Sequence, residues 1–217
     1  MALWTWNQEA KRYIVTSEGA GILGKKAGTF VSVDDLTGAR EKFIDYQKRQ
    51  AQSLIDDLLS EKIDITQWTL QMREQIKQSH LAQYMLAKGG KNQMTQSDYG
   101  WLGNALRNQY QYLNGFANDI LSGDLSDAQI QARANMYFNG SNASFERGKA
   151  ASYGDLRLPA YPGDGSRTQC LSNCKCSWHI EDMPGAWWAY WRLSPAEHCA
   201  DCIELSSTWN PLVISKI

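Results

Sequence analysis

The sequence predicts a mainly α-helical protein, with a multi-helix body of about four long helices followed by a small Cys-rich α/β appendage at the C-terminus. The first 158 of the 217 residues contain no proline and no cysteine. Long helices are therefore permitted, because an interior proline costs a helix about 3 kcal/mol. All five prolines, all five cysteines and five of the nine tryptophans lie at or after Pro159. The two stretches therefore differ in composition, and we expect them to differ in structure.

The overall composition is that of an ordinary soluble globular protein, with 43% hydrophobic and 21% charged residues and a net charge of -1. No apolar run approaches the roughly 20 residues that span a bilayer, and the N-terminus lacks a secretory signal, so we expect no membrane partner. The near-zero charge gives no electrostatic reason to expect a specific nucleic-acid partner.

Residues 1–33 are predicted to form an N-terminal arm or a β-hairpin. Ile14-Val15 and the run from Phe30 to Val33 favour strands, and several glycines lie between them. A mobile surface segment is the alternative interpretation.

The helical body is predicted over residues 34–152. Apolar residues recur at helical spacing over 34–61, which predicts the first long helix. Thr66 is expected to cap a second helix that stops at Gly89-Gly90, because glycine tolerates the left-handed conformation that closes a helix.

Two further long helices follow from their start and stop residues. Thr95-x-x-Asp98 resembles a capping box and opens a helix that Gly123 stops. Ser126 and Asp127 open a fourth helix that ends near Asn139-Gly140. A short helix over 143–151 is also expected.

The appendage is predicted over residues 153–217. A turn-rich segment from Pro159 to Gly165 leads to strand-prone pieces at 176–180 and 187–193. Pro195-Ala196-Glu197 is expected to start a short helix that carries Cys199 and Cys202, because proline suits the first helical turn. A unit of about 60 residues has a marginal core of its own, so we expect a covalent or metal staple, or a docking surface.

The cysteines have the spacing of a tetrahedral zinc site. Cys174 and Cys176 form one close pair, and Cys199 and Cys202 form another after 22 intervening residues. These four are the predicted ligands of a structural zinc ion, and Cys170, His179 or His198 could replace one of them. Reduced core thiols and disulfides remain alternatives, although an odd number of cysteines disfavours a disulfide framework.

No catalytic or cofactor-binding residues are predicted, and we expect a non-enzymatic protein. One alternative is a zinc- or thiol-dependent enzyme centred on Cys199 and His198. Another is a zinc-knuckle nucleic-acid-binding module, which the four basic against six acidic residues of the stretch 159–217 disfavour.

The aromatic run from Trp187 to Trp191 is either part of the core or a docking patch. Alternate residues of a strand point to opposite faces, so its four aromatic side chains cannot all point inward. We therefore expect one face of this strand to meet another domain or protein.

Three segments resemble Mu-type phage head morphogenesis proteins, also called minor capsid proteins. The run 173–176, Asn-Cys-Lys-Cys, resembles their N-C-R/K-C signature, and Cys199-x-x-Cys202 resembles the companion C-x-x-C element. Ala132-Arg133-Ala134 with Tyr137 is similar to an ARA-x-x-Y helix of such proteins. The two cysteine elements occur here in the reverse of the expected order.

The resemblance implies a structural protein of a tailed-phage virion, in the head–portal–neck region. Its partners would be portal, capsid or neck proteins, and homo-oligomers are expected in the assembled particle. It would be found in the virion, and in the host cytoplasm during assembly.

Overall fold

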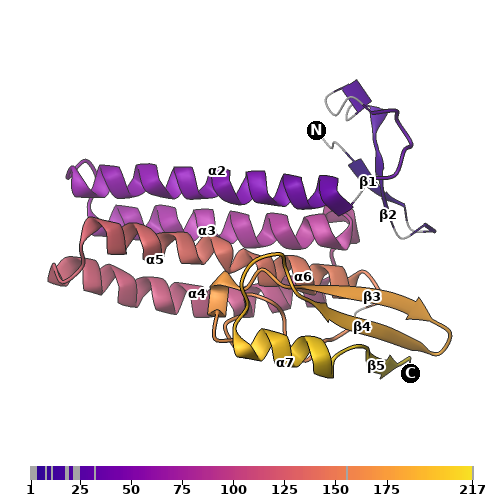
Figure 1. Ribbon diagram of the computed structural model, residues 1–217. Helices are drawn as coiled ribbons and strands as arrows, with labels where there is room; N and C mark the ends of the chain where they lie inside the picture. The colour runs from indigo at the N-terminus through magenta and orange to yellow at the C-terminus, as the bar shows by residue number, and fades with distance from the viewer. Residues whose placement is uncertain are drawn as a thin grey trace.

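Helices that lie side by side form the long part of the molecule (Figure 1). The computed structural model describes residues 4–7, 9–10, 12–17, 20–21, 25–31, 33–154 and 156–216. Within these, the long helices are α2 (Val33–Leu59), α3 (Ile65–Lys88), α4 (Gln96–Ser122) and α5 (Asp127–Asn139). The predicted mainly α-helical class with a small α/β appendage is confirmed.

Capping residues set the helix ends. The predicted capping box at the start of α4 is present, with Thr95 N–H donating to Asp98 Oδ2 at 2.7 Å and Asp98 N–H donating to Thr95 Oγ1 at 3.3 Å. The cap expected at Thr66 is wrong: Asp64 caps α3 in a box with Gln67, because its carboxylate accepts the Gln67 N–H at 2.8 Å. Gly89 ends α3 in the left-handed conformation, at φ 108°.

The core of the helical body lies between α2, α3, α4 and α5. Trp68 of α3 is fully buried and meets the Phe116 ring of α4 edge-on, with 5.6 Å between the ring centroids. Phe116 stacks on Tyr137 of α5 at 6.3 Å. These large side chains join three helices, and burial of each contributes about 1.5–3 kcal/mol. Ala51, Leu54 and Ile55 of α2 belong to the same core, so the apolar stripe predicted over 34–61 faces it.

A short central helix, α6 (Ser141–Ala151), connects the body to the C-terminal part. All its residues except Lys149 are buried, because α6 packs on α3 and also contacts the C-terminal sheet. Ala143 and Ala150 of α6 belong to the same core as the C-terminal tryptophans. That core thus crosses the boundary predicted at residues 152 and 153.

The C-terminal part contains a three-stranded antiparallel sheet in the order β3-β4-β5 and one helix. Its elements are β3 (Ser177–Met183), β4 (Ala186–Arg192), α7 (Ala200–Thr208) and β5 (Leu212–Ser215). The two predicted strand-prone pieces are confirmed as β3 and β4. The helix start expected at Pro195 is wrong, because Cys199 is the N-cap of α7 in an extended conformation, at ψ 161°.

Tryptophans fill the core of this part. Trp178 of β3 stacks on Trp209 and meets Trp191 of β4 edge-on, each with a centroid separation of 5.2 Å. Ala189 and Trp191 point into this core, whereas Trp188 and Tyr190 lie on the other face of β4 and are half-buried. Only one face of the aromatic run therefore packs in the core.

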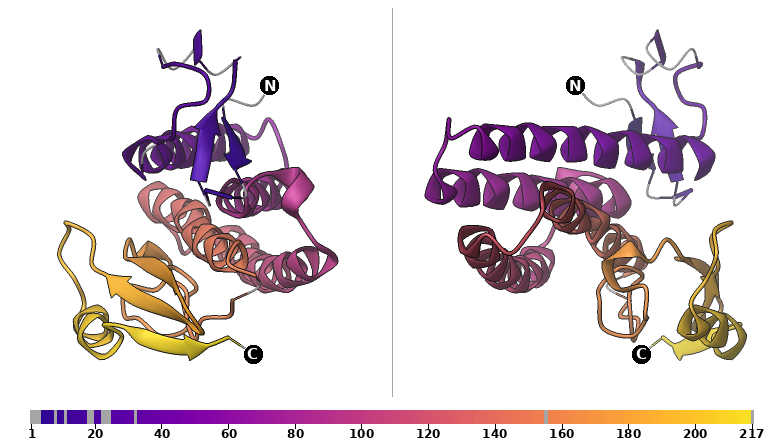
Figure 2. Two further views of the ribbon diagram at one scale, coloured as in Figure 1. Left: turned by 90° about the vertical axis from the view of Figure 1, so that its right-hand side faces the viewer. Right: turned by 60° about the vertical axis from the view of Figure 1, so that its left-hand side comes forward.

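A two-stranded hairpin lies at one end of the helical body, on the side away from the C-terminal sheet (Figure 2). Strands β1 (Trp4–Asn7) and β2 (Arg12–Val15) pair antiparallel, and Ile14 also bridges to Phe30. The predicted partner near Phe30 therefore pairs with β2 through a bridge, and β1 is a second partner that was not predicted. Ser32 lies outside the described residues, and Val33 begins α2 rather than extending a strand. None of the described helices is both long and apolar enough to cross a membrane.

Candidate metal centre

All five cysteines come together at one place in the C-terminal part. Cys170, Cys174 and Cys176 lie in the loop that leads into β3, around the short 3-10 helix η2 (Leu171–Asn173). Cys199 caps α7, and Cys202 lies in its first turn. The sequence elements that were predicted to supply one metal site therefore meet in space.

The helical body holds the cysteine loop in place. The Asn142 side chain of α6 donates to the carbonyl oxygen of Cys174 at 3.2 Å and to that of Pro162 at 3.3 Å. The Asn139 amide, at the end of α5, donates to Asn173 at 2.8 Å. The loop is therefore anchored from two helices.

The sulfur separations suit a metal centre. Cys170 Sγ lies 3.6 Å from Cys199 Sγ and 3.7 Å from Cys202 Sγ, and Cys174 Sγ lies 3.6 Å from Cys202 Sγ. In a tetrahedral site with metal–sulfur bonds of about 2.3 Å, neighbouring sulfurs lie about 3.8 Å apart. A disulfide needs about 2.05 Å. The five cysteines are free thiols, spaced as ligands.

The sulfurs form two overlapping groups of three. One contains Cys170, Cys199 and Cys202, and the other contains Cys174, Cys176 and Cys202; within each group all sulfurs lie within 4.8 Å of one another. The four predicted ligands are thus divided between two groups, and Cys170 joins the cluster as a fifth thiol. Which of them bind a metal stays a prediction.

The two candidate histidines lie in different places. His198 Nδ1 is 4.0 Å from Cys176 Sγ, at the edge of the cluster. His179 is on the outer face of β3, where its Nε2 lies 3.1 Å from Glu181 Oε1 and its ring lies near Tyr190. The structure therefore brings His198 to the cysteines and places His179 elsewhere.

The thiols have different environments. Burial and neighbouring sulfurs raise the pKa of Cys202, and a hydrogen bond with Cys176 together with burial raises that of Cys174. Burial alone would also raise the pKa of Cys199, but hydrogen bonds from the backbone amides of Cys202 and Cys170 outweigh it and lower this pKa to about 7. Without a cation the Cys174 and Cys202 thiols stay protonated, so metal binding at these two residues must release protons.

A buried carboxylate that no sequence pattern predicted, that of Glu146, fixes the sheet to α6. The fully buried Glu146 carboxylate accepts the Trp178 backbone N–H at 2.8 Å and lies 2.7 Å from Lys149 Nζ. Trp178 is only two residues from Cys176, so this contact fixes the strand that leaves the cysteine cluster. No sequence motif marks Glu146, because its partner in β3 is distant in the chain.

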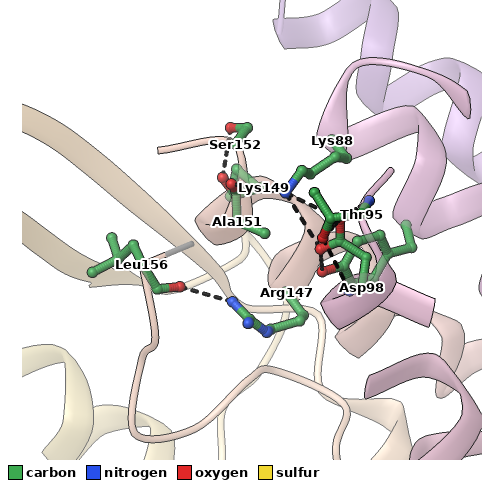
Figure 3. A network of polar contacts seen from close by, with 9 residues as sticks. Lys88, Thr95, Asp98, Arg147, Lys149, Ala151, Ser152 and Leu156 are labelled. Carbon is green, nitrogen blue, oxygen red and sulfur yellow. Dashed lines mark hydrogen bonds and ion pairs between the residues drawn. The ribbon is translucent and has the colours of Figure 1, made fainter. Parts of the chain in front are cut away.

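A second polar network joins α3, α4 and the end of α6 (Figure 3). The Asp98 carboxylate, 1% exposed on its side chain, lies 3.2 Å from Lys88 Nζ and also accepts the Tyr84 hydroxyl. Lys88 in turn donates to the Ala151 carbonyl oxygen at 3.2 Å. Both networks hold α6 in position, and α6 positions the cysteine loop.

Comparison with known proteins gives no relative: no protein-family model matches the chain, and no curated protein or solved structure matches it significantly. The resemblance to phage head morphogenesis proteins therefore stays a prediction.

Proposed function

We propose that this protein is a non-enzymatic structural component of a tailed-phage virion. It acts in the head–portal–neck region by binding portal, capsid or neck proteins and copies of itself. A structural zinc ion bound by the cysteine cluster holds the C-terminal part in the conformation that assembles.

The observation that carries this proposal is the meeting of the two cysteine elements. The segments that resemble the phage signature, residues 173–176 and 199–202, are far apart in sequence, yet their thiols lie within metal-binding distance. Cysteine sulfur is a preferred zinc ligand, and cysteine-only or cysteine-rich sites are typical of structural zinc. Three of the five thiols, those of Cys174, Cys176 and Cys202, are buried.

The position of the cluster supports a role as a staple. Cys174, Cys176 and Cys202 belong to the same core as Trp178 and Trp191, so a bound ion adds cross-links to a small core. Small domains of this size commonly need such a cross-link for stability. A stapled core gives a rigid surface for assembly.

The surface supports a role in assembly. Tyr112 and Leu121 on α4 are 68% and 65% exposed, and Val213 on β5 is 56% exposed. A hollow of about 390 Å³ lies between α4, α5 and the loop at 163–172, beside the cysteines, and is lined in part by Tyr112, Met136 and Leu171. Large apolar side chains at such sites gain burial when another protein binds.

The test is the composition of purified particles. Tailed-phage particles produced from the genome that encodes this chain are purified by density and analysed by quantitative mass spectrometry. The proposal expects the chain at a fixed copy number per particle, cross-linked to portal, capsid or neck proteins. Its absence from particles, with a monomeric chain that binds none of these proteins, overturns the proposal.

A further inference from the structure

Cys202 lies at the centre of the cysteine cluster. Its sulfur is 3.7 Å from Cys170 Sγ on one side and 3.6 Å from Cys174 Sγ on the other. It is also the one residue shared by the two groups of three sulfurs. In a site with one tetrahedral ion the four ligands are equivalent, and a fifth thiol stays outside. Here Cys202 lies close to sulfurs of both groups, which differs from the geometry of a single tetrahedral site.

We infer that the cluster binds two divalent metal ions of the zinc class, bridged by the Cys202 thiolate. An outer ion is held by Cys170, Cys199 and Cys202. An inner ion is held by Cys174, Cys176 and Cys202. A thiolate sulfur has more than one lone pair, so it can bind two ions at once. This inference rests on the metal centre of the proposed function and adds its stoichiometry and ligands.

The candidate fourth donor to the inner ion is His198, which lies beside Cys176 but outside the group of three sulfurs that are within 4.8 Å of one another. His198 Nδ1 lies 4.0 Å from Cys176 Sγ, close to the separation between a nitrogen and a sulfur ligand of one zinc ion, about 3.5 Å. The three thiols of this group are buried, and Asn142 fixes the carbonyl group of Cys174. A set of three cysteines and one histidine is a common closed zinc site.

The outer ion has three donors from the chain. Cys170 and Cys199 are only half-buried, so water can reach this group and complete the coordination. The Cys170 and Cys199 sulfurs are 3.6 Å apart, which is close to the edge of a tetrahedral thiolate site.

Charge favours two ions over one. Metal-bound cysteines are thiolates, so four of them leave a net charge of about -2 around one divalent ion, whereas all five leave about -1 around two. Negative charge in a partly buried site is costly without compensation. The neighbouring residues supply little compensating positive charge, because Lys175 is exposed and Glu197 and Asp201 add negative charge to the same region.

The experiment is a metal count on the full-length chain. Protein purified under reducing conditions is saturated with Zn²⁺ and freed of excess metal. Bound zinc is then measured by elemental analysis and native mass spectrometry, and thiols that still react are counted. The inference expects two zinc ions per chain and no rapidly reacting thiol.

Two matched variants assign the ligands. Cys170→Ser removes a ligand of the outer group only, and Cys176→Ser removes one of the inner group only, so each is expected to bind about one zinc ion. Cys202→Ser removes the bridge and is expected to bind fewer ions than either. The single-ion site of Cys174, Cys176, Cys199 and Cys202 instead predicts no loss in Cys170→Ser and complete loss in Cys176→Ser.

The outcomes separate this inference from the proposed metal centre. One zinc ion per wild-type chain, with a reactive fifth thiol, overturns the two-ion site and leaves the structural zinc standing. Two ions that both survive Cys170→Ser and Cys176→Ser overturn the bridged arrangement. No bound zinc overturns both the inference and the zinc staple.

Discussion

Gly148 of α6 lies directly against the backbone of Tyr84 in α3: a Cβ atom at position 148 would stand 2.5 Å from the Tyr84 carbonyl oxygen. Real carbon–oxygen contacts are much longer, so only glycine permits this helix crossing. The obstacle is backbone, which cannot rotate away as a side chain can. The close approach of α3 and α6 therefore depends on one missing methyl group.

Gly148→Ala should consequently destabilise the protein by about 1–3 kcal/mol, because the added methyl forces the two helices apart. Urea unfolding followed by far-ultraviolet circular dichroism measures the change. The control is Gly115→Ala in α4, where an added Cβ meets nothing within 4 Å. This variant should gain about 0.5–1 kcal/mol from helix propensity. Equal effects of the two substitutions would contradict the packing described for α6.

Glu146→Gln tests the ion pair within α6 whose carboxylate also accepts a hydrogen bond from β3. The amide can still accept the Trp178 N–H, but it leaves Lys149 without its charged partner at 2.7 Å. We expect a loss of about 2–4 kcal/mol in the free energy of unfolding, because removing one partner of a buried pair is costly.

The matched control for this substitution is Glu74→Gln. Glu74 pairs with Lys77 at 3.3 Å on the exposed face of α3, where both side chains are more than half exposed. Its loss should change stability by less than about 0.5 kcal/mol. If Glu146→Gln is equally harmless, the Glu146–Lys149 ion pair does not stabilise the fold.

His80 makes stability depend on pH. The imidazole is buried, its Nδ1 lies 2.7 Å from Ser144 Oγ, and burial lowers its pKa to about 4 from an ordinary 6.5. The unfolded chain therefore binds the proton first, and stability falls as the pH falls from about 6.5 to 4. The full effect is at most about 3 kcal/mol.

The measurement compares wild type with His80→Asn at several pH values between 4 and 7, by urea unfolding of zinc-saturated protein. The difference between the two curves isolates His80, because the thiol and carboxyl groups titrate in both proteins. The difference should narrow toward low pH, since only the wild type loses this contribution. A constant difference would show that His80 is not held neutral in the fold.

Removing the metal should disorder the C-terminal part and spare most helices. Trp178 and Trp191 pack in the same core as Cys174 and Cys202, so their near-ultraviolet circular dichroism reports on the cluster. A strong chelator under reducing conditions should abolish most of this signal and leave most of the far-ultraviolet helical signal. Added zinc should restore it.

Cys202→Ser provides the comparison for this experiment. Its near-ultraviolet signal should already be weak, and the chelator should change it little. A wild-type signal that persists after complete metal removal would show that the tryptophan core folds without the ion.

Local signals account for what the sequence could predict. Thr95 with Asp98, and the glycines at 89 and 123, act within one turn of chain, so the helix ends that they set could be read directly. Asp64 with Gln67 is an equally local capping box, so the start of α3 could also have been predicted from the sequence. The class of the appendage also followed from its local pattern of prolines and aromatic residues.

Tertiary contacts decide the features of the fold and of the cysteine cluster that the sequence did not predict. The start of α7 at Ala200 instead of Pro195 depends on Cys199, whose extended backbone brings its thiol to Cys170, across 29 residues of chain. From the spacing, Cys170 was predicted only as a possible replacement for one of the four zinc ligands, because the sequence cannot show which sulfurs lie close together. Glu146 contacts β3, and Gly148 lies against Tyr84 of α3. Both partners are distant in the chain, so no local pattern predicts these contacts.

X-ray absorption at the zinc edge tests the central claim, that the cysteine cluster is a metal centre. The full-length chain is purified under reducing conditions with zinc supplied and excess removed. The account predicts a first shell dominated by sulfur at about 2.3 Å, with at most a minor nitrogen or oxygen contribution. A shell made only of nitrogen and oxygen at about 2.0–2.1 Å, or protein without bound zinc, would contradict it.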